Sequence, residues 1–318
     1  MQIVVVGCGV SGLSSAIRLQ EGGHEVRIWT RDVPPNITSN IAAAIWHPYK
    51  AFPIDRVVGW GQRTYAVLRE LAQTPATGVT LTEGLEVYRE PVDDPWWRDC
   101  IEHFRRATPE ELGSEYKDGY VFDSAVVETP IYLTYLISRF QGLGGVIEQR
   151  EVTSLSDPLA QSDIVVNCTG LGARTLLDDA ELFPIRGQIL RTTRPDIERI
   201  MLDEDEEYGV TYVVPRSGDC ILGGTAQVGN WSLEPSNEDA AGIIDRCSHL
   251  APAVRGVTVL EQLVGLRPGR TTVRLEVEKA ADGKLVVHNY GHGGAGITLS
   301  WGCAEEVSGL VQAHADNP

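Results

Sequence analysis

The sequence predicts an α/β protein with two lobes, one built on a parallel β-sheet and the other on a mostly antiparallel one. Residues 3–29 read as a strand, a glycine-rich turn, a helix and a second strand. Residues 187–290 instead alternate polar and apolar side chains between tight-turn sequences, as antiparallel hairpins do. A chain of 318 residues is long enough for two such lobes.

The first strand leads into a nucleotide-binding motif. The run from Ile3 to Val6 is typical of a strand that is buried on both faces. Gly7, Gly9 and Gly12 follow as G-x-G-x-x-G, directly before an apolar helical pattern. Glycines let the backbone approach a pyrophosphate, and the helix N-terminus points its free amides at the negative charge. The strand before the motif and the helix after it favour a Rossmann-like lobe over a tight turn without a ligand.

The end of the second strand does not decide which nucleotide binds. An acidic residue is expected there for the ribose hydroxyls, but Asp32 comes late and Arg31 stands before it. Arg31 either binds a 2′-phosphate, which would indicate NADP, or faces another phosphate or solvent. Both residues are candidates for cofactor binding.

The middle of the chain supplies the other elements of both lobes. Residues 34–53 form a loop-rich stretch that either packs against a flat ligand or lies on the surface. A helix is predicted over residues 56–73, and residues 74–118 are expected to be irregular. A strand, a helix and a strand follow over residues 120–128, 129–141 and 146–152. The expected boundaries place residues 1–73, 120–180 and 285–318 in the first lobe and residues 74–119 and 181–284 in the second.

Two later points bring the main chain towards the nucleotide. A buried strand over 164–168 runs into Thr169 and Gly170. The last strand, over 285–290, leads into a loop in which Gly291, Gly293, Gly294 and Gly296 allow positive φ and close approach. A helix follows, with its N-terminus near Thr298. A flat, electron-accepting ring fits this place, because free amides and the helix dipole stabilise the negative charge of a reduced isoalloxazine.

Composition disfavours several partners and sites. The formal net charge of −17 argues against nucleic acid. No apolar run has the length of a membrane span. The chain enters a strand at its first residues and ends without a peroxisomal tripeptide, so we expect a cytoplasmic location. The six cysteines show no CxxC pair and no metal-ligand spacing, which predicts buried thiols and no metal, with one disulfide left open.

Motifs along nearly the whole chain occur in the order of one known family. They are VVVGCGVSGLSSA, AAAIWHPY, VVNCTGLGA, RGQI, YVVP, LGGTAQVGNW, GLRPGRTTVRLE and HNYGHGGAGITLSWG. Together they closely resemble the D-amino-acid oxidases. The resemblance implies the glutathione-reductase type of flavoprotein fold and non-covalent FAD in place of NAD or NADP. It also implies oxidation of a D-amino acid by O2 to a 2-oxo acid, ammonia and hydrogen peroxide, and leaves a homodimer open.

The resemblance further implies which residues hold the substrate. Arg267, in GLRPGR, would grip the carboxylate with its planar guanidinium, and Tyr212 would donate a hydrogen bond to the same group. Tyr208 matches the family's lid tyrosine, and the Gly294 carbonyl would accept from the amine. His292 is expected to shape the flavin pocket, because the family's hydride transfer needs no general base.

Side-chain preference rests on the stretch before Tyr208. The related D-aspartate oxidases hold a second carboxylate with a basic residue. Here the stretch is apolar and then acidic, which favours neutral D-amino acids, and Arg199 is the candidate for the opposite preference. Arg270 is expected to be structural.

The candidate cofactor-binding residues belong to the two glycine loops, the strand ends and the 34–53 stretch. They are Gly7, Gly9, Val10, Ser11, Gly12, Arg31, Asp32, Thr38, Ser39, Ala43, Ala44, Ile45, Val152, Thr169, Gly170, Gly293, Gly294, Ala295, Gly296, Ile297 and Thr298.

Other functions remain as alternatives. A D-aspartate oxidase, or a D-amino-acid dehydrogenase that passes electrons to another acceptor, would share most of these residues. The terminal motif argues against a glycine or sarcosine oxidase, and the carboxylate clamp argues against a non-catalytic nucleotide-binding protein.

Overall fold

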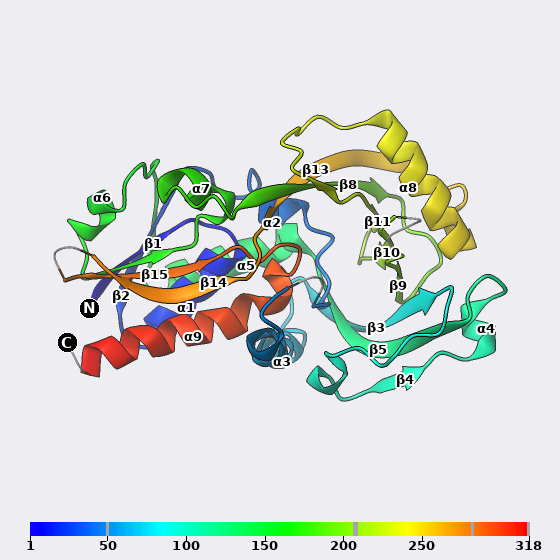
Figure 1. Ribbon diagram of the computed structural model, residues 1–318, viewed down its shortest axis with the longest axis horizontal. Helices are drawn as coiled ribbons and strands as arrows, with labels where there is room; N and C mark the ends of the chain where they lie inside the picture. Colours follow the sequence, from blue (N-terminus) through cyan, green and yellow to red (C-terminus); the bar gives the residue numbers. More distant parts are fainter. Residues whose placement is uncertain (49–50, 206–208, 281–282, 317–318) are drawn as a thin grey trace.

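The computed structural model describes residues 1–48, 51–205, 209–280 and 283–316. Two sheets lie side by side, and each forms the centre of one lobe (Figure 1). The N-terminus and the end of the last helix both lie at the outer end of the first lobe. The predicted α/β class is confirmed.

The first sheet has six strands within the described residues, in the order β14–β15–β7–β1–β2–β6. Their bounds are β1 (Gln2–Val6), β2 (Glu25–Thr30), β6 (Val146–Gln149), β7 (Ile164–Asn167), β14 (Arg274–Lys279) and β15 (Leu285–Tyr290). All pairs are parallel except β14 with β15. Residues 3–6 are buried, as their continuous apolar run predicts, because helices and loops cover both faces of a parallel sheet.

Four long helices of the described part of the chain accompany the first sheet. They are α1 (Val10–Glu21), α3 (Ile54–Leu71), α5 (Thr129–Gly142) and α9 (Gly296–Asp316). α9 packs against both α1 and α3, and α5 packs against α1. One stripe of α9 is fully buried, from Trp301 through Ala304 and Val307 to Val311.

The second sheet has nine strands within the described residues and is mostly antiparallel. Its strands are hydrogen-bonded in the order β12–β8–β11–β10–β9–β3–β5–β4. The ninth strand, β13, also pairs with β8 but stands outside this order. The bounds are β3 (Val79–Tyr88), β4 (Phe104–Arg106), β5 (Asp118–Val127), β8 (Phe183–Thr192), β9 (Ile200–Asp203), β10 (Thr211–Pro215), β11 (Cys220–Gly223), β12 (Gln227–Val228) and β13 (Val259–Gly269). The helix α8 (Asn237–Leu250) packs on this sheet, and Ser236 caps its N-terminus by accepting a hydrogen bond from the amide of Asp239.

Three strands differ from the sequence prediction. β3 is a ten-residue strand inside the stretch that was predicted to be irregular. β5 pairs with β3 and β4, so it belongs to the second sheet rather than to the first lobe. β14 pairs with β15 and so joins the first sheet rather than the second lobe. Pairing partners that are distant in sequence decide these memberships, and the lobe boundaries themselves stay a prediction.

The remaining elements are short. They are α2 (Thr38–Ile41), α4 (Pro109–Leu112), α6 (Ser156–Leu159), α7 (Ala173–Leu176) and the 3₁₀ turns Arg98–Cys100, Gly170–Gly172 and Pro252–Val254. All six cysteines are buried free thiols, which settles the disulfide that the sequence left open. Among the described helices, none is long and apolar enough to cross a membrane.

Candidate active site

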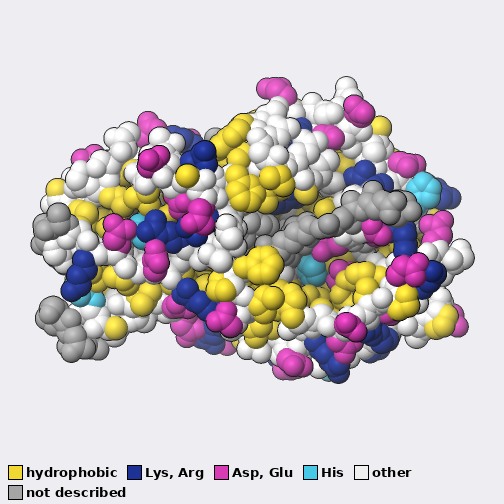
Figure 2. Space-filling view, in the orientation of Figure 1, with side chains coloured by type: hydrophobic (Ala, Val, Ile, Leu, Met, Phe, Trp, Pro, Cys, Tyr) yellow, Lys and Arg dark blue, Asp and Glu magenta, His cyan; other side chains and the backbone are white. Residues whose placement is uncertain are grey.

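A cavity of about 1090 Å³ lies where the two lobes meet. The space-filling view is hollowed between the lobes (Figure 2). The cavity exceeds the roughly 300–1,000 Å³ that small-ligand pockets usually have. Its walls come from both lobes and include residues 6–11, 30–32, 35–39, 41–45, 150–153, 168–172, 264–268 and 292–294. One wall therefore carries the glycine-rich loops of the first lobe, and another carries strands of the second sheet.

The first glycine loop forms one end of this cavity. Gly7 has a φ of 111°, and a Cβ there would lie 2.5 Å from the Cys168 carbonyl oxygen. Gly9 lines the cavity directly before α1, and the Val10 amide donates to Ser39 Oγ at 3.1 Å. Gly12 does not line the cavity, because it packs α1 against the loop, where a Cβ would lie 2.9 Å from the Gly7 carbonyl carbon. Gly12 thus packs α1 against the loop, and its role in cofactor binding stays a prediction.

The end of β2 lines the same part of the cavity. Arg31 Nε and an Asp32 carboxylate oxygen are 2.7 Å apart, and both side chains are substantially exposed. Asp32 therefore offsets the charge of Arg31 at this position. Arg150 and Glu151 also line this end, and the Arg150 amide donates to the Thr30 carbonyl at 2.7 Å.

The second glycine loop enters the cavity between the lobes. Gly293 has a φ of 55°, and its amide donates to the Pro268 carbonyl of β13 at 2.9 Å. Gly293, Gly294, Gly296 and Ile297 line the cavity. The predicted contacts Ala295 and Thr298 do not line it.

Ala295 is fully buried, and the Thr298 hydroxyl is committed to the 45–47 segment. That hydroxyl donates to the His47 carbonyl at 2.9 Å and accepts from the His47 amide at 3.2 Å. The side chain of Thr298 therefore fixes α9 to this segment and does not face the cavity.

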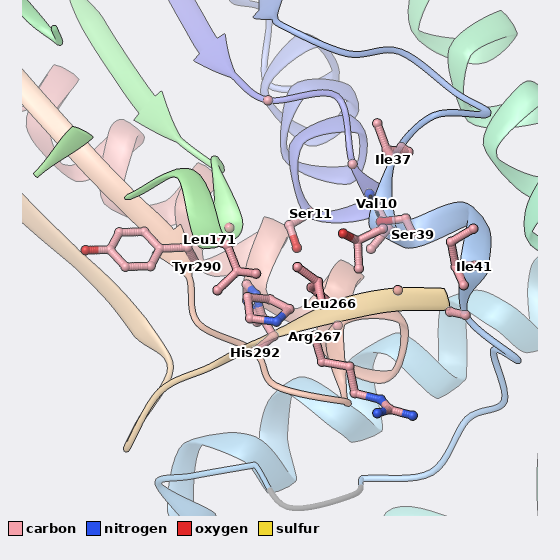
Figure 3. Close-up of a pocket in the computed structure, with 18 of the residues that line it drawn as sticks. Val10, Ser11, Ile37, Ser39, Ile41, Leu171, Leu266, Arg267, Tyr290 and His292 are labelled. Atoms are coloured by element: carbon pink, nitrogen blue, oxygen red, sulfur yellow. Dashed lines mark hydrogen bonds between the residues drawn. The ribbon is translucent and has the colours of Figure 1, made fainter. Parts of the chain in front are cut away.

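The 34–53 stretch packs along the cavity. This position favours the interpretation that the stretch packs against a flat ligand over the interpretation that it lies on the surface. Thr38, Ser39 and Ala43 to Ile45 all line it, as do Val152, Thr169 and Gly170. In the close-up, Ile37, Ser39 and Ile41 lie on the side of the cavity opposite Leu171 and Tyr290 (Figure 3).

Arg267 and Tyr212 both line the cavity from the second sheet. Arg267 extends from β13 (Figure 3), and its Nη1 donates to the Thr225 carbonyl at 2.9 Å. Its guanidinium lies over Gly187 of β8, where a Cβ would be 2.6 Å from Cζ. The Tyr212 ring similarly lies over Gly223 and Gly224, and a Cβ on Gly224 would be 2.8 Å from the hydroxyl.

Each of these side chains thus needs a glycine beneath it. These glycines belong to the motifs RGQI and LGGTAQVGNW, but neither motif by itself indicates that a side chain packs on them. The proposed lid residue Tyr208 lies outside the described residues.

His292 is buried in the cavity wall. Burial lowers the pKa of His292 to about 4, so the imidazole is neutral at pH 7. Its Nε2 donates to Asn289 Oδ1 at 3.0 Å. A neutral donor held in this way shapes the wall.

Two other arginines lie outside this wall. Arg270 pairs with Asp179 and Glu181, each at 3.1 Å. Arg199 pairs with Glu111 at 2.8 Å and does not line the cavity. Arg199 is therefore not placed to bind a second substrate carboxylate.

A charged group that the sequence did not predict lies at the second-sheet end of the cavity. His47 and Glu204 line the cavity, and Glu86 lies directly behind His47. Possible ligand atoms of the three residues lie within 4.8 Å of one another, although no metal spacing was seen in the sequence. His47 stands in the quoted motif AAAIWHPY and Glu204 in the acidic stretch, which were the only available signals.

A two-lobed fold with two glycine loops around one cavity defines a flavin-dependent oxidoreductase. A family model described as FAD dependent oxidoreductase matches residues 2–310, and the chain belongs to this family. FAD is the cofactor of this family.

Relatives and solved structures agree with that assignment. The chain is 54% identical to a D-amino-acid oxidase of Rubrobacter xylanophilus over 311 residues, which covers 98% of this chain and 95% of the relative. It is 38% identical to a D-aspartate oxidase of Homo sapiens over 98% of this chain and 94% of that relative. Glycine oxidase from Geobacillus kaustophilus has the same fold, with a TM-score of 0.81 at 19% identity and 98% and 94% of the two chains covered.

Proposed function

We propose that this chain oxidises neutral D-amino acids to 2-oxo acids, ammonia and hydrogen peroxide. One observation carries the proposal: Arg267 and Tyr212 line the same cavity as both glycine loops. A pair of side chains suited to a carboxylate and two loops suited to a flavin therefore line one space. The name of the relative that is 54% identical agrees with this activity.

The cavity wall fits FAD at its first-lobe end. Gly7 and Gly9 leave the backbone bare before α1, where a pyrophosphate would accept from free amides. Gly293 and Gly294 likewise leave the backbone bare before α9. A bound FAD would supply the two-electron oxidation of the substrate and the transfer of those electrons to O2. The residues in contact with the cavity would hold it without a covalent bond.

Three groups of this chain would orient the substrate. The planar guanidinium of Arg267 suits a bidentate grip on the carboxylate. The Tyr212 hydroxyl would donate to the same carboxylate, and the Gly294 carbonyl would accept from the amine. When the carboxylate and the amine are both held, only one enantiomer directs its Cα hydrogen towards the flavin ring. The site would therefore select the D-enantiomer. Tyr208 stays a candidate for the lid.

The side-chain end of the cavity favours a neutral substrate. Ile189, Leu202 and Val214 line it with apolar surface. Among the described lining residues the other arginines are Arg31 and Arg150, and both lie at the end of β2. A second carboxylate, as in D-aspartate, would therefore meet no arginine there.

Anaerobic mixing of the FAD-loaded protein with amino acids tests the proposal. D-alanine and D-valine should bleach the flavin absorbance, whereas their L-forms and D-aspartate should leave it. Readmitting air should restore the absorbance and release hydrogen peroxide. Bleaching that persists in air would indicate a dehydrogenase, and no bleaching by any D-amino acid would refute the substrate assignment.

A further inference from the structure

The helix α8 lies on the face of the second sheet that points away from the cavity. It packs against β10 and β11 (Figure 1). Tyr212 and Val214 of β10 line the cavity, whereas Val213 between them packs with Ile243 and Cys247 of α8. Successive side chains of a strand point to opposite faces of its sheet. A side chain of α8 can therefore influence the cavity through the backbone of these two strands.

Arg246 of α8 reaches the end of the sheet where β10 begins and β11 ends. Its Nη2 donates to the Gly224 carbonyl at 2.8 Å, and its Nε donates to the Thr211 hydroxyl at 3.2 Å. The Thr211 hydroxyl donates onward to the Gly209 carbonyl at 3.1 Å. Gly209 also lies against the guanidinium, since a Cβ there would be 3.6 Å from Arg246 Cζ. Arg246 thus joins the chain at the start of β10 to the chain just after β11.

The backbone that Arg246 holds also supports both side chains proposed to bind the substrate carboxylate. We name residues 223–225 the support segment. The Tyr212 ring lies over Gly223 and Gly224. Arg267 Nη1 donates to the carbonyl of the next residue, Thr225, at 2.9 Å. Arg246 and Arg267 therefore bind consecutive carbonyl oxygens, and a shift of Gly224 would move the surface beneath Tyr212 and the acceptor of Arg267 together.

The guanidinium of Arg246 is a firm anchor for this backbone, because a charged donor makes stronger hydrogen bonds than a neutral one. Among the described residues, Arg246 forms no ion pair with a carboxylate that would compete for these donors. Cys247 adds weaker contacts, since its Sγ lies 3.5 Å from the Tyr212 carbonyl oxygen and 3.6 Å from that of Gly223. Two consecutive residues of α8 therefore hold the backbone that carries Tyr212.

We propose that Arg246 is a positioning residue for the substrate carboxylate: it fixes the support segment so that Tyr212 and Arg267 reach the carboxylate together. The inference rests on the proposed function and adds to it a residue of α8. Arg246 does not line the cavity, so it acts through the support segment and not by contact with the substrate. Its loss should weaken carboxylate binding and leave the flavin end of the cavity unchanged.

Propionate tests the proposal, because it has the carboxylate of D-alanine without the amine. Its Kd for the FAD-loaded protein is measured from the change in flavin absorbance, alongside the steady-state kinetics of D-alanine. Arg246→Met should raise this Kd and the KM for D-alanine about tenfold, as expected for loss of a charge-assisted hydrogen bond, while kcat stays close to the wild type. Arg246→Lys keeps a charged donor and should recover part of the loss. Arg255→Met removes an exposed arginine beyond α8 and should leave both constants unchanged.

A double variant separates positioning from a general loss of structure. Gly187→Ala places a Cβ 2.6 Å from Arg267 Cζ and so displaces the guanidinium that Arg246 is proposed to position. Mutations that act through one shared group are not additive. Adding Arg246→Met to Gly187→Ala should therefore raise the KM for D-alanine by less than Arg246→Met does alone.

The other outcomes each count against the inference or against the proposed function. A propionate Kd and a KM that Arg246→Met leaves unchanged overturn the inference, as do fully additive effects in the double variant. A loss of kcat, FAD affinity and melting temperature that Arg246→Lys does not reverse assigns Arg246 to the fold and also overturns it. If D-alanine does not reduce the flavin of the wild type, the proposed function fails, whereas the propionate Kd values still test Arg246.

Discussion

At the scale of single residues, the site depends on glycines as much as on charged side chains. The Arg267 guanidinium and the Tyr212 ring lie directly on the backbone of β8 and β11. Any side chain at Gly187 or Gly223 would occupy the same space. Gly187 is interesting because the atoms it would displace are the far end of a flexible side chain. A substitution there moves the guanidinium and leaves the sheet in place.

Gly187→Ala should therefore reduce catalysis with little loss of stability. The new Cβ would lie 2.6 Å from Arg267 Cζ, so the guanidinium must leave its position. Losing a charge-assisted pair costs about 1.5–3 kcal/mol, or roughly tenfold to hundredfold in kcat/KM, mainly through KM. Steady-state kinetics with D-alanine would measure it, and the FAD spectrum and melting temperature should stay close to the wild type. Gly218→Ala, whose Cβ meets no atom within 4 Å, is the matched control; equal kinetics in both variants would contradict the assignment.

At the scale of elements, α9 joins the glycine loop to the core of the first lobe. It begins at Gly296 beside the cavity and packs on α1 and α3. The Ser14 hydroxyl of α1 donates to the Ser300 carbonyl at 3.1 Å. The closest approach is at Gly302, which lies against the Trp60 backbone of α3. Helices that touch backbone to backbone cannot adjust to an added methyl group without moving apart.

Gly302→Ala should destabilise the protein and loosen FAD. A Cβ at Gly302 would lie 2.7 Å from the Trp60 carbonyl carbon, so α9 must shift. Overpacking of this kind typically costs about 1–3 kcal/mol. The same substitution at Gly309, on the exposed side of α9, meets no atom within 4 Å and should stabilise by about 0.5–1 kcal/mol. Thermal unfolding with and without FAD would compare them; a Gly302→Ala variant as stable as Gly309→Ala would show that the two helices have room to separate.

At the scale of the whole molecule, the sequence predicts what is local and misses what depends on distant pairing. The strand–turn–helix–strand unit of β1, α1 and β2 lies within one short segment, so its pattern is complete in the sequence. The membership of β5 and β14 depends on partners elsewhere, and the alternation of β3 was masked by the polar residues around it. Arg267 and Tyr212 were found through motifs of a family. The cluster of His47, Glu86 and Glu204 was not, because β3, β9 and a loop bring it together only in the fold.

His47 also connects the two lobes. Its backbone is hydrogen-bonded on both sides to Thr298 of α9, in the first lobe. Its side chain faces Glu86 of β3, in the second sheet, and Glu204, which follows β9. The protonation state of one imidazole therefore bears on how firmly the lobes are joined.

The stability of the molecule should consequently fall at alkaline pH. The pKa of His47 is raised from 6.5 to about 9 in the folded state, so its proton stabilises the fold fully below about pH 6.5 and is lost as the pH rises through 9. At about 1.36 kcal/mol for each pKa unit, this contributes up to about 3 kcal/mol between those two pH values. Urea unfolding of the FAD-saturated protein, followed by tryptophan fluorescence at pH 6.5 and 9, would measure the change. His47→Gln should flatten it, whereas His249→Gln, at an exposed site, should keep the wild-type slope. If His47→Gln retains the full alkaline loss, the imidazole is neutral in the folded state and does not join the lobes by charge.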